Sequence, residues 1–236
     1  MAPPLPLASL NTTIIRCRRC PRLVAYREAV ARRRKRQFAT WEYWGRPVPG
    51  IGDPRARILL VGLAPAAHGG NRTGRMFTGD GSADFLTPAL HRAGLVSQPT
   101  SVSRDDGLRY RNLYMTAAVR CAPPDNKPLP SEFAYCREYL LRELQVLRGL
   151  RVIMALGAIA HTEVLRATKT LGWTIPSPRP AFAHGATSAL LRPDGRRVTL
   201  IASYHPSRQN TQTKRLTAPM LDRVMRDVVA QARRAP

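Results

Sequence analysis

Four short apolar runs alternate with helix-like segments, and this alternation constrains the fold more than any other feature of the sequence. The runs lie at about residues 57–63, 113–119, 152–156 and 198–203. Each has the length and apolar content of a strand buried on both faces of a sheet. Helices are expected at about 83–93, 131–147, 157–167 and 218–234, with Ser82 and Ser131 as N-caps. The pattern predicts an α/β fold, a three-layer α/β/α arrangement around a central, mostly parallel four-stranded sheet.

The length of the chain, 236 residues, suits one domain. We expect residues 1–15, which include three early prolines, to be a flexible tail, and residues 16–236 to form a single domain. A helix at 16–38 is expected to carry a CRRC motif near its start. The same helix ends in five consecutive basic residues, Arg32 to Arg36, which form either a solvated face or a contact for DNA.

The charge of the chain indicates a polyanionic partner. The chain has 38 Lys and Arg against 15 Asp and Glu, which gives a formal net charge of +23. A charge of this size repels itself in the compact state, so it points to nucleic acid or an anionic membrane surface. No apolar stretch is long enough to span a membrane, and no secretory signal precedes the first helix. We therefore expect a cytoplasmic, nucleoid-associated monomer.

The four cysteines of the chain are Cys17, Cys20, Cys121 and Cys136. Structural disulfides are rare in a reducing compartment. The arginines around the CRRC motif favour thiolates, and a second, distant pair can complete a four-thiolate site. Zinc and an iron–sulfur cluster both fit four thiolates, and the spacing does not separate them. Four buried, unreactive thiols are the remaining alternative.

Three polar loops follow the carboxyl ends of predicted parallel strands, where ligands bind in open α/β sheets. They are residues 64–82, 120–130 and 204–217. In the first loop, Phe77 is either a core residue or a platform for base stacking, and Asp80 is either a helix cap or a general base that orients water. In the second, Asn126 either forms a turn or reads a base edge. In the third, His205 precedes a basic, hydroxyl-rich segment that suits phosphate contacts.

Together, these loops resemble the uracil-DNA glycosylase superfamily, and more narrowly its family 5. The resemblance rests on Gly62-Leu63-Ala64-Pro65-Ala66 with GNRTGRMFTGD after it, on Cys121-Ala-Pro-Pro-Asp-Asn-Lys, and on His205-Pro206-Ser207. The CRRC motif with the later C-x14-C resembles the [4Fe–4S] ligand set of families 4 and 5. The resemblance therefore implies a [4Fe–4S] cluster on the four cysteines.

The resemblance also implies an activity and a set of roles. The enzyme would be a monofunctional glycosylase that flips uracil out of DNA and hydrolyses its N-glycosidic bond. Phe77 would stack on the base, His205 would stabilise the departing base, and Asp80 would activate water beside the Gly62–Ala64 backbone. The implied base-binding residues are Phe77, Asn126, Gly62, Leu63 and Ala64, and those predicted to contact DNA are Arg72, Arg75, Ser207 and Arg208. The rival function is a non-catalytic, metal- or cluster-stabilised DNA-binding module.

Two departures from the wider superfamily pattern bear on specificity. Ala64 stands where family 4 has an acidic or polar residue, and Ala117 stands where family 4 has a base-reading Asn. Both departures resemble family 5 and predict a loose specificity that includes hypoxanthine and other deaminated or damaged bases. The type that cross-links covalently to uracil carries a basic insertion after the first motif. Since GNRTGRMFTGD continues without one, cross-linking is not expected.

Overall fold

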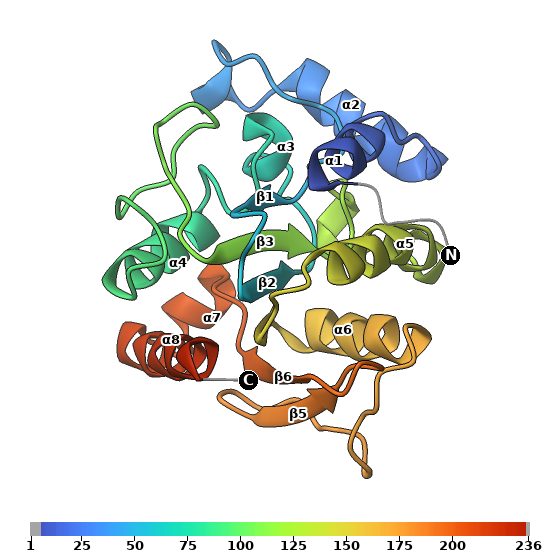
Figure 1. Ribbon diagram of the computed structural model, residues 1–236. Helices are drawn as coiled ribbons and strands as arrows, with labels where there is room; N and C mark the ends of the chain where they lie inside the picture. Colours follow the sequence, from blue (N-terminus) through green and yellow to red (C-terminus); the bar gives the residue numbers. More distant parts are fainter. Residues whose placement is uncertain (1–5, 235–236) are drawn as a thin grey trace.

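The computed structural model describes residues 6–234, which form a six-stranded sheet covered by helices on both faces (Figure 1). The strand order is β1-β3-β2-β4-β6-β5. The strands are β1 (Ile51–Gly52), β2 (Ile58–Gly62), β3 (Leu113–Ala117), β4 (Val152–Leu156), β5 (Thr187–Leu191) and β6 (Arg197–Ser203). The expected α/β class and the four expected strands, β2, β3, β4 and β6, are confirmed.

The sheet has six strands rather than four, which corrects the predicted count. The four expected strands run parallel in the centre, with Leu59 of β2 opposite Tyr114 of β3 and Ile153 of β4. The two additional strands, β1 and β5, pair antiparallel at the two edges. The central runs are mostly apolar because both faces are buried, with Thr116 in β3 and Thr199 in β6 among the polar exceptions, whereas β5 is partly exposed and β1 has only two residues. Edge strands therefore lack this apolar signal.

The helices divide between the two faces of the sheet (Figure 1). On one face, α1 (Leu7–Ile15), α5 (Pro130–Val146) and α6 (Ala158–Thr170) pack against the side that carries Leu59 and Val61. On the other, α4 (Gly81–Arg92) and α8 (Ala218–Arg233) pack against Ile58 and Leu60. The remaining helices are α2 (Pro21–Arg33), α3 (Gly70–Thr73), α7 (Arg208–Gln212) and two 3-10 turns, Arg36–Phe38 and Pro124–Asn126. The alternation along β2 gives one core layer on each face.

The N-terminal segment is not a flexible tail from residue 7 onward. It forms α1, whose Leu7, Leu10 and Ile14 are buried in the same core as α5. Complete burial of a Leu or Ile side chain contributes about 1.5–3 kcal/mol, enough to hold this helix on the domain surface. The three early prolines masked the apolar spacing of residues 7, 10 and 14. Residues 1–5 lie outside the part of the chain that the structure describes.

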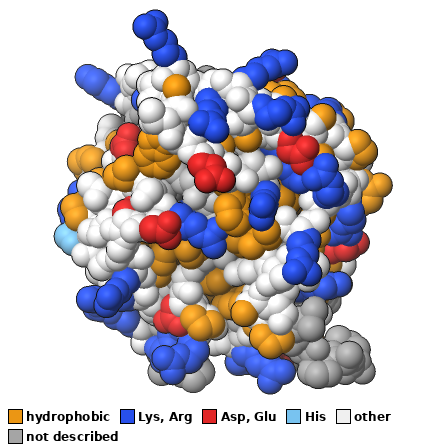
Figure 2. All heavy atoms as spheres, turned by 90° about the horizontal axis from the view of Figure 1, so that it is seen from above, with side chains coloured by type: hydrophobic (Ala, Val, Ile, Leu, Met, Phe, Trp, Pro, Cys, Tyr) orange, Lys and Arg blue, Asp and Glu red, His pale blue; other side chains and the backbone are white. Residues whose placement is uncertain are grey.

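The expected helix at 16–38 is shorter than predicted. Helix α2 begins at Pro21, directly after the CRRC motif, because the ring of proline suits the first position of a helix. It ends at Arg33, and Arg34 has a φ of +53°. The run Arg32 to Arg36 therefore spans the end of the helix and the following turn. Figure 2 looks down from above, where α1 and α2 lie in Figure 1, and shows basic side chains spread over this face with acidic ones between them.

No helix within residues 6–234 is long and apolar enough to cross a bilayer.

Candidate active site at the carboxyl ends of the parallel strands

The carboxyl ends of strands β2, β3, β4 and β6 lie at the same end of the sheet. The three predicted loops come together there. The loop after β3 is bonded to the end of β2, since Ala118 N donates to Gly62 O and Val119 N donates to Leu63 O, both at 2.9 Å. The segment after β4 is bonded to the end of β6, since Gly157 N donates to Ser203 O at 2.8 Å. These backbone bonds fix where the first and third loops leave the sheet.

Phe77 lies on the end of β2. A Cβ at position 62 would come 2.6 Å from Cζ of Phe77, so the aromatic ring rests directly on the backbone of Gly62. Phe77 has a φ of +47°, a conformation that costs free energy for a bulky side chain. The ring is half-buried, and its centroid is 6.1 Å from that of His205 at an interplanar angle of 36°. The structure therefore brings Phe77, Gly62 and His205 together.

His205 follows β6 and is held by its own backbone. Its carbonyl accepts a hydrogen bond from Nδ2 of Asn210 at 2.9 Å, while neither of its ring nitrogens bonds to a group of residues 6–234. Burial lowers the pKa of His205 to about 4. The imidazole is therefore neutral near pH 7, and its ring N–H remains available to a ligand.

Asp80 is the N-cap of α4. Its Oδ1 accepts hydrogen bonds from Ser82 N at 2.9 Å and Ala83 N at 3.0 Å, which corrects the prediction that Ser82 caps this helix. Oδ2 lies against the Cα of Gly69 and accepts no hydrogen bond from the described residues. Burial raises the pKa of the carboxyl, and the two backbone bonds lower it in part. Asp80 is thus a helix cap through one oxygen, and its second oxygen is unused.

Arg72 and Arg75 are buried, and the expectation that they contact DNA is corrected. Arg72 is 3% exposed, donates to the carbonyls of His68 and Gly79, and stacks on the rings of Phe38 and Trp41. Arg75 is 2% exposed and forms a two-pronged ion pair with Asp106 at 2.8 and 2.6 Å. Both guanidinium groups brace the loops around the site, so neither can reach a phosphate in this conformation.

The other predicted DNA-contact residues are accessible. Ser207 is half-buried at the N-terminus of α7, and its side chain forms no cap hydrogen bond. Arg208 is exposed, and its side chain crosses the first residue of α4: a Cβ at Gly81 would come 2.6 Å from Nε of Arg208. Asn126 is exposed at the end of a 3-10 turn with a φ of +56°. Arg208 therefore lies beside the helix that Asp80 caps.

The four cysteines line one small pocket. Cys20, Cys121 and Cys136 are buried, Cys17 is half-buried, and all four are free thiols. Burial raises the pKa of Cys121 to about 11 and that of Cys136 to about 12. Within residues 6–234, no group of three or more His, Cys, Asp or Glu side chains is arranged to hold a single metal ion. The thiols thus share a pocket but do not converge on a one-ion site.

Arg27 is a functional candidate that the sequence analysis missed. Its side chain is 2% exposed, Nη1 donates to Sγ of Cys121 at 2.9 Å, and Nη2 donates to the carbonyl of Cys17 at 3.3 Å. Nε is buried without a partner. Nδ2 of Asn71, in the first loop, donates to the carbonyl of Arg27 at 3.2 Å. The signal that could have identified Arg27 is its position one helical turn after the buried Leu23, on the inner face of α2.

His68, in the first loop, forms a polar pair with Tyr43, which lies before β1. The hydroxyl of Tyr43 lies 3.0 Å from Nδ1 of His68, and the backbone N of Lys35 donates to the same hydroxyl. Burial lowers the pKa of His68, and the nearby charges of Lys35 and Arg72 lower it further. His68 lies within the polar loop 64–82, and no sequence motif points to Tyr43.

Known proteins match the chain over most of its length. Residues 49–229 match the family model of the uracil DNA glycosylase superfamily. A type-5 uracil-DNA glycosylase of Thermus thermophilus is 56% identical over 213 residues, 90% of this chain and 92% of the relative. One of Mycobacterium tuberculosis is 50% identical over 222 residues, covering 94% and 80%. One of Pyrobaculum aerophilum is 50% identical over 219 residues, covering 93% and 90%. The superfamily match spans all three loops of the candidate site.

Proposed function

This chain belongs to the uracil-DNA glycosylase superfamily, and from this premise we propose that it is a type-5 enzyme that removes uracil from DNA. The expectation drawn from the sequence motifs is thereby confirmed at the level of the family and its glycosylase activity. The reaction breaks the bond between the sugar C1′ and the base nitrogen. Water supplies a hydroxyl group to C1′ and a proton to the base, which leaves an abasic sugar. The observation that carries the proposal is the stack of Phe77 on Gly62 beside His205.

Phe77 and Gly62 provide the platform for the flipped base. The ring rests on the end of β2, is only half-buried, and has its neighbour His205 at a centroid distance of 6.1 Å. Stacking on an aromatic ring contributes about 1–3 kcal/mol per base. Leu63 and Ala64 continue the backbone beyond Gly62 and line the side from which water approaches. Any side chain at position 62 would displace the ring from this place.

His205 stabilises the departing base. Negative charge develops on the base as the C1′–N bond breaks, and a neutral imidazole N–H directed at a base oxygen stabilises that charge. The lowered pKa of His205 suits this role, because a group with a pKa of about 4 does not ionise before the reaction near pH 7. The two ring nitrogens are unused by the described protein and are therefore available to the base.

Asp80 holds the attacking water and stabilises the positive charge on the sugar. Oδ1 is fixed by Ser82 and Ala83, so the free Oδ2 has a defined direction. A carboxylate of this kind acts as a general base or as an electrostatic partner of the sugar. The cap and the catalytic role are compatible because they use different oxygens.

The pocket discriminates weakly between bases. Ala117, at the end of β3, is buried with Val48 and Met76 and offers no hydrogen bond to a base edge. A site without such a contact rejects other bases less sharply. We propose that hypoxanthine is released within about a hundredfold of uracil, which corresponds to about 2.7 kcal/mol of discrimination. Asn126, on the accessible turn after β3, remains the candidate for base reading.

The four cysteines hold a [4Fe–4S] cluster in this proposal. Four free thiols line one pocket, and a buried guanidinium, that of Arg27, donates to one of them. Zinc binds thiolates at about 2.3 Å and needs them to converge, whereas a cluster takes its ligands from further apart. When bound, the cluster would cross-link the segment before α2, the loop after β3 and helix α5, and its role would be structural because hydrolysis requires no electron transfer.

DNA that contains uracil or other deaminated bases is the substrate, and the accessible Arg208 and Ser207 are its proposed phosphate contacts. Both lie on the loop that carries His205, so a phosphate bound there positions the sugar near Asp80. We further propose that one molecule acts alone on nucleoid DNA in the cytoplasm. Sedimentation of the protein with and without a short duplex tests its monomeric state.

Single-turnover release of uracil from an oligonucleotide tests the proposed function. The native protein is expected to release uracil and to leave an alkali-labile abasic site, and His205→Ala is expected to slow release by about ten- to a thousandfold. DNA affinity should change little, since the interaction acts mainly in the transition state. Binding without any release, in native protein with its full iron content, would instead indicate a non-catalytic DNA-binding module.

A further inference from the structure

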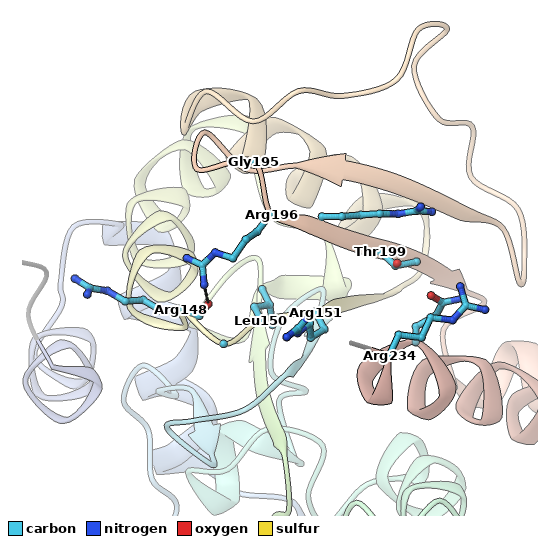
Figure 3. Close-up of a pocket in the computed structure, with 10 residues that line it drawn as sticks. Arg148, Leu150, Arg151, Gly195, Arg196, Thr199 and Arg234 are labelled. Carbon is cyan, nitrogen blue, oxygen red and sulfur yellow. Dashed lines mark hydrogen bonds between the residues drawn. The ribbon is translucent and has the colours of Figure 1, made fainter. Parts of the chain in front are cut away.

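A pocket of about 420 Å³ lies at the amino ends of the parallel strands, at the opposite end of the sheet from the active site. It is lined by the turn before β4, the hairpin turn before β6 and the end of α8, as Figure 3 shows. Residues 148–151 precede β4, whereas Gly157 follows it. Residues 195–196 precede β6 and Arg197 begins it, whereas His205 follows it. A strand of five residues is about 16 Å long, so the two sites are separated by at least that distance.

Arginines dominate this pocket. Its lining includes Arg148, Arg151, Arg196, Arg197 and Arg234, and no Asp or Glu. Asp194, on the adjoining turn, pairs with Arg196 at 2.5 Å, and a further bond links Nη1 of Arg196 to the carbonyl of Arg148 at 2.8 Å. Arg148, Arg151 and Arg197 form no ion pair with a carboxylate of residues 6–234. Within residues 6–234, these three neighbouring cations therefore form no ion pair.

Further arginines lie along the amino ends of the parallel strands, where Asp53 also lies and accepts a hydrogen bond from the backbone N of Asn112 at 3.3 Å. Arg57 directly precedes β2, Arg111 lies two residues before β3, Arg151 directly precedes β4 and Arg197 is the first residue of β6. Arg57 and Arg151 are adjacent, since the carbonyl of Arg57 accepts hydrogen bonds from Arg151 N at 2.8 Å and Val152 N at 3.0 Å. We name Arg57, Arg111, Arg148, Arg151 and Arg197 the amino-edge strip.

The chemistry of the amino-edge strip indicates its ligand. The planar fork of arginine matches phosphate oxygens, and cations along a concave wall focus a positive field that attracts anions. Four neighbouring strands span about 14 Å, which suits successive phosphates of one strand better than a single small anion. The pocket lining contains no aromatic ring on which a base could stack, so the backbone rather than the bases would be bound.

We propose that the amino-edge strip binds the phosphodiester backbone of a second DNA segment while the active site holds the first. This goes beyond base excision, because it makes the protein a bridge between two segments. A protein that contacts both can pass from one to the other without dissociating. The strip is the surface for this transfer, and a carboxylate-rich protein segment is the competing ligand that the test must separate from DNA.

The test uses full-length, iron-loaded protein and two uracil-free duplexes. One duplex is immobilised, the other is fluorescent, and retention of the second on the first is measured with protein present. Mass photometry of the mixture counts duplexes per protein molecule. The variant is Arg148→Glu/Arg151→Glu/Arg197→Glu, with the Gln triple variant as a milder version in case charge reversal impairs folding. The matched control, Arg142→Glu/Lys169→Glu/Arg226→Glu, changes three exposed cations on α5, α6 and α8 by the same total charge.

The native protein and the matched control are expected to retain the second duplex, with one protein molecule per two duplexes. The strip variants should retain about tenfold less or lower, and the log–log salt slope of the second binding event should decrease by about 3. Single-turnover release of uracil from a short duplex should change by less than about threefold, because the strip lies away from the reacting sugar.

Three results would contradict the proposal that the amino-edge strip binds a second DNA segment. One is a native protein that never holds more than one duplex. Another is an equal loss in the matched control, which would make the effect one of total charge. The third concerns competition. If polyglutamate displaced the second duplex at a lower concentration of negative charges than competing DNA does, the ligand of the strip would be an acidic protein segment. Failure of uracil release in every protein tested would count only against the proposed function.

Discussion

The ring of Phe77 rests on the backbone of Gly62, so that a Cβ at residue 62 would lie 2.6 Å from Cζ. Gly62→Ala is therefore expected to displace the ring and to weaken capture of the flipped base. Uracil release should slow by about tenfold or more, with a smaller effect on binding of undamaged duplex. Single-turnover kinetics and the fluorescence of a flipped base analogue measure the two effects. Gly149→Ala is the control for a general effect of glycine replacement, because its φ is not positive and a Cβ there meets only ordinary contacts at 3.6 Å and 3.9 Å.

Asp80→Asn separates the cap from the catalytic role. Asparagine is as good an N-cap as aspartate, so the melting temperature should be preserved, whereas Asp80→Ala should lose about 1 kcal/mol of stability. If Oδ2 acts on water, both variants should slow single-turnover release by about ten- to a thousandfold. Thermal melting and kinetics of the two variants decide the matter. Full activity of Asp80→Asn would move the water-activating role to another group, with His68 and Asn71 next in line.

The protonation of His205 should follow the lowered pKa. The neutral imidazole is favoured in the folded protein, so its contribution to stability is present above the ordinary pKa of 6.5 and is lost as the pH falls toward 4. The melting temperature of the native protein should therefore fall more between pH 6.5 and pH 4 than that of His205→Asn. Uracil release should not decline between pH 8 and pH 5 through protonation of this residue. If the melting temperatures of the native protein and of His205→Asn fell equally with pH, burial would not disfavour the imidazolium.

Arg75 should behave as a structural residue. Its guanidinium is buried against Asp106, and removing one member of such a pair costs about 3–5 kcal/mol. Arg75→Ala should therefore lower the melting temperature strongly while DNA affinity, measured well below that temperature, stays within about twofold.

The carboxyl of Asp106 adds a pH signature to this pair. Burial raises its pKa, but the bonds from Arg75 and from backbone amides lower it overall to about 2. Because the folded-state pKa is lowered, this stability is present above the unfolded pKa and is lost as the pH falls from about 4 toward 2. A stability profile of Asp106→Asn that matches the native protein in this range would contradict the assignment.

Cys121→Ser tests the cysteine pocket. The variant is expected to lose iron and inorganic sulfide, to lose visible absorbance, and to melt at a lower temperature, since four thiolates cross-link distant segments. Arg27→Met keeps all four thiols and removes the guanidinium bonds to Sγ of Cys121 and to the carbonyl of Cys17, so it should retain iron but lose it faster to a chelator. Metal analysis of anaerobically purified protein provides the measurement. One zinc ion and no iron per chain would exclude the cluster.

The parallel core and the position of the site were predictable because their signals are local. Strands β2, β3 and β4 are fully buried and almost entirely apolar, and parallel connectivity alone places Gly62 and His205 at the same end of the sheet. The edge strand β5 has no such run, and α1 was obscured by the prolines before it. In each case the neighbours that bury the segment lie far away in the sequence.

The roles of the loop arginines and of Asp80 depend on tertiary partners that no local pattern reveals. Arg72 and Arg208 both follow a polar loop residue, yet Phe38 and Trp41 cover the first while the second remains exposed. Arg75 is buried because Asp106, some thirty residues later, reaches it. Asp80 was expected to be either a cap or a base, and the structure shows that one carboxylate oxygen is enough for the cap.

The two hydrogen bonds that hold Oδ1 of Asp80 have an energetic consequence for the reaction. They set the orientation of the carboxylate during folding, before any substrate arrives. An electrostatic group that is already oriented needs no reorganisation when charge develops on the sugar, so the carboxylate acts at its full strength from the start. The first turn of α4 thus holds the carboxylate of Asp80 in place before the reaction. Fraying of this turn would release the carboxylate before the molecule as a whole unfolds.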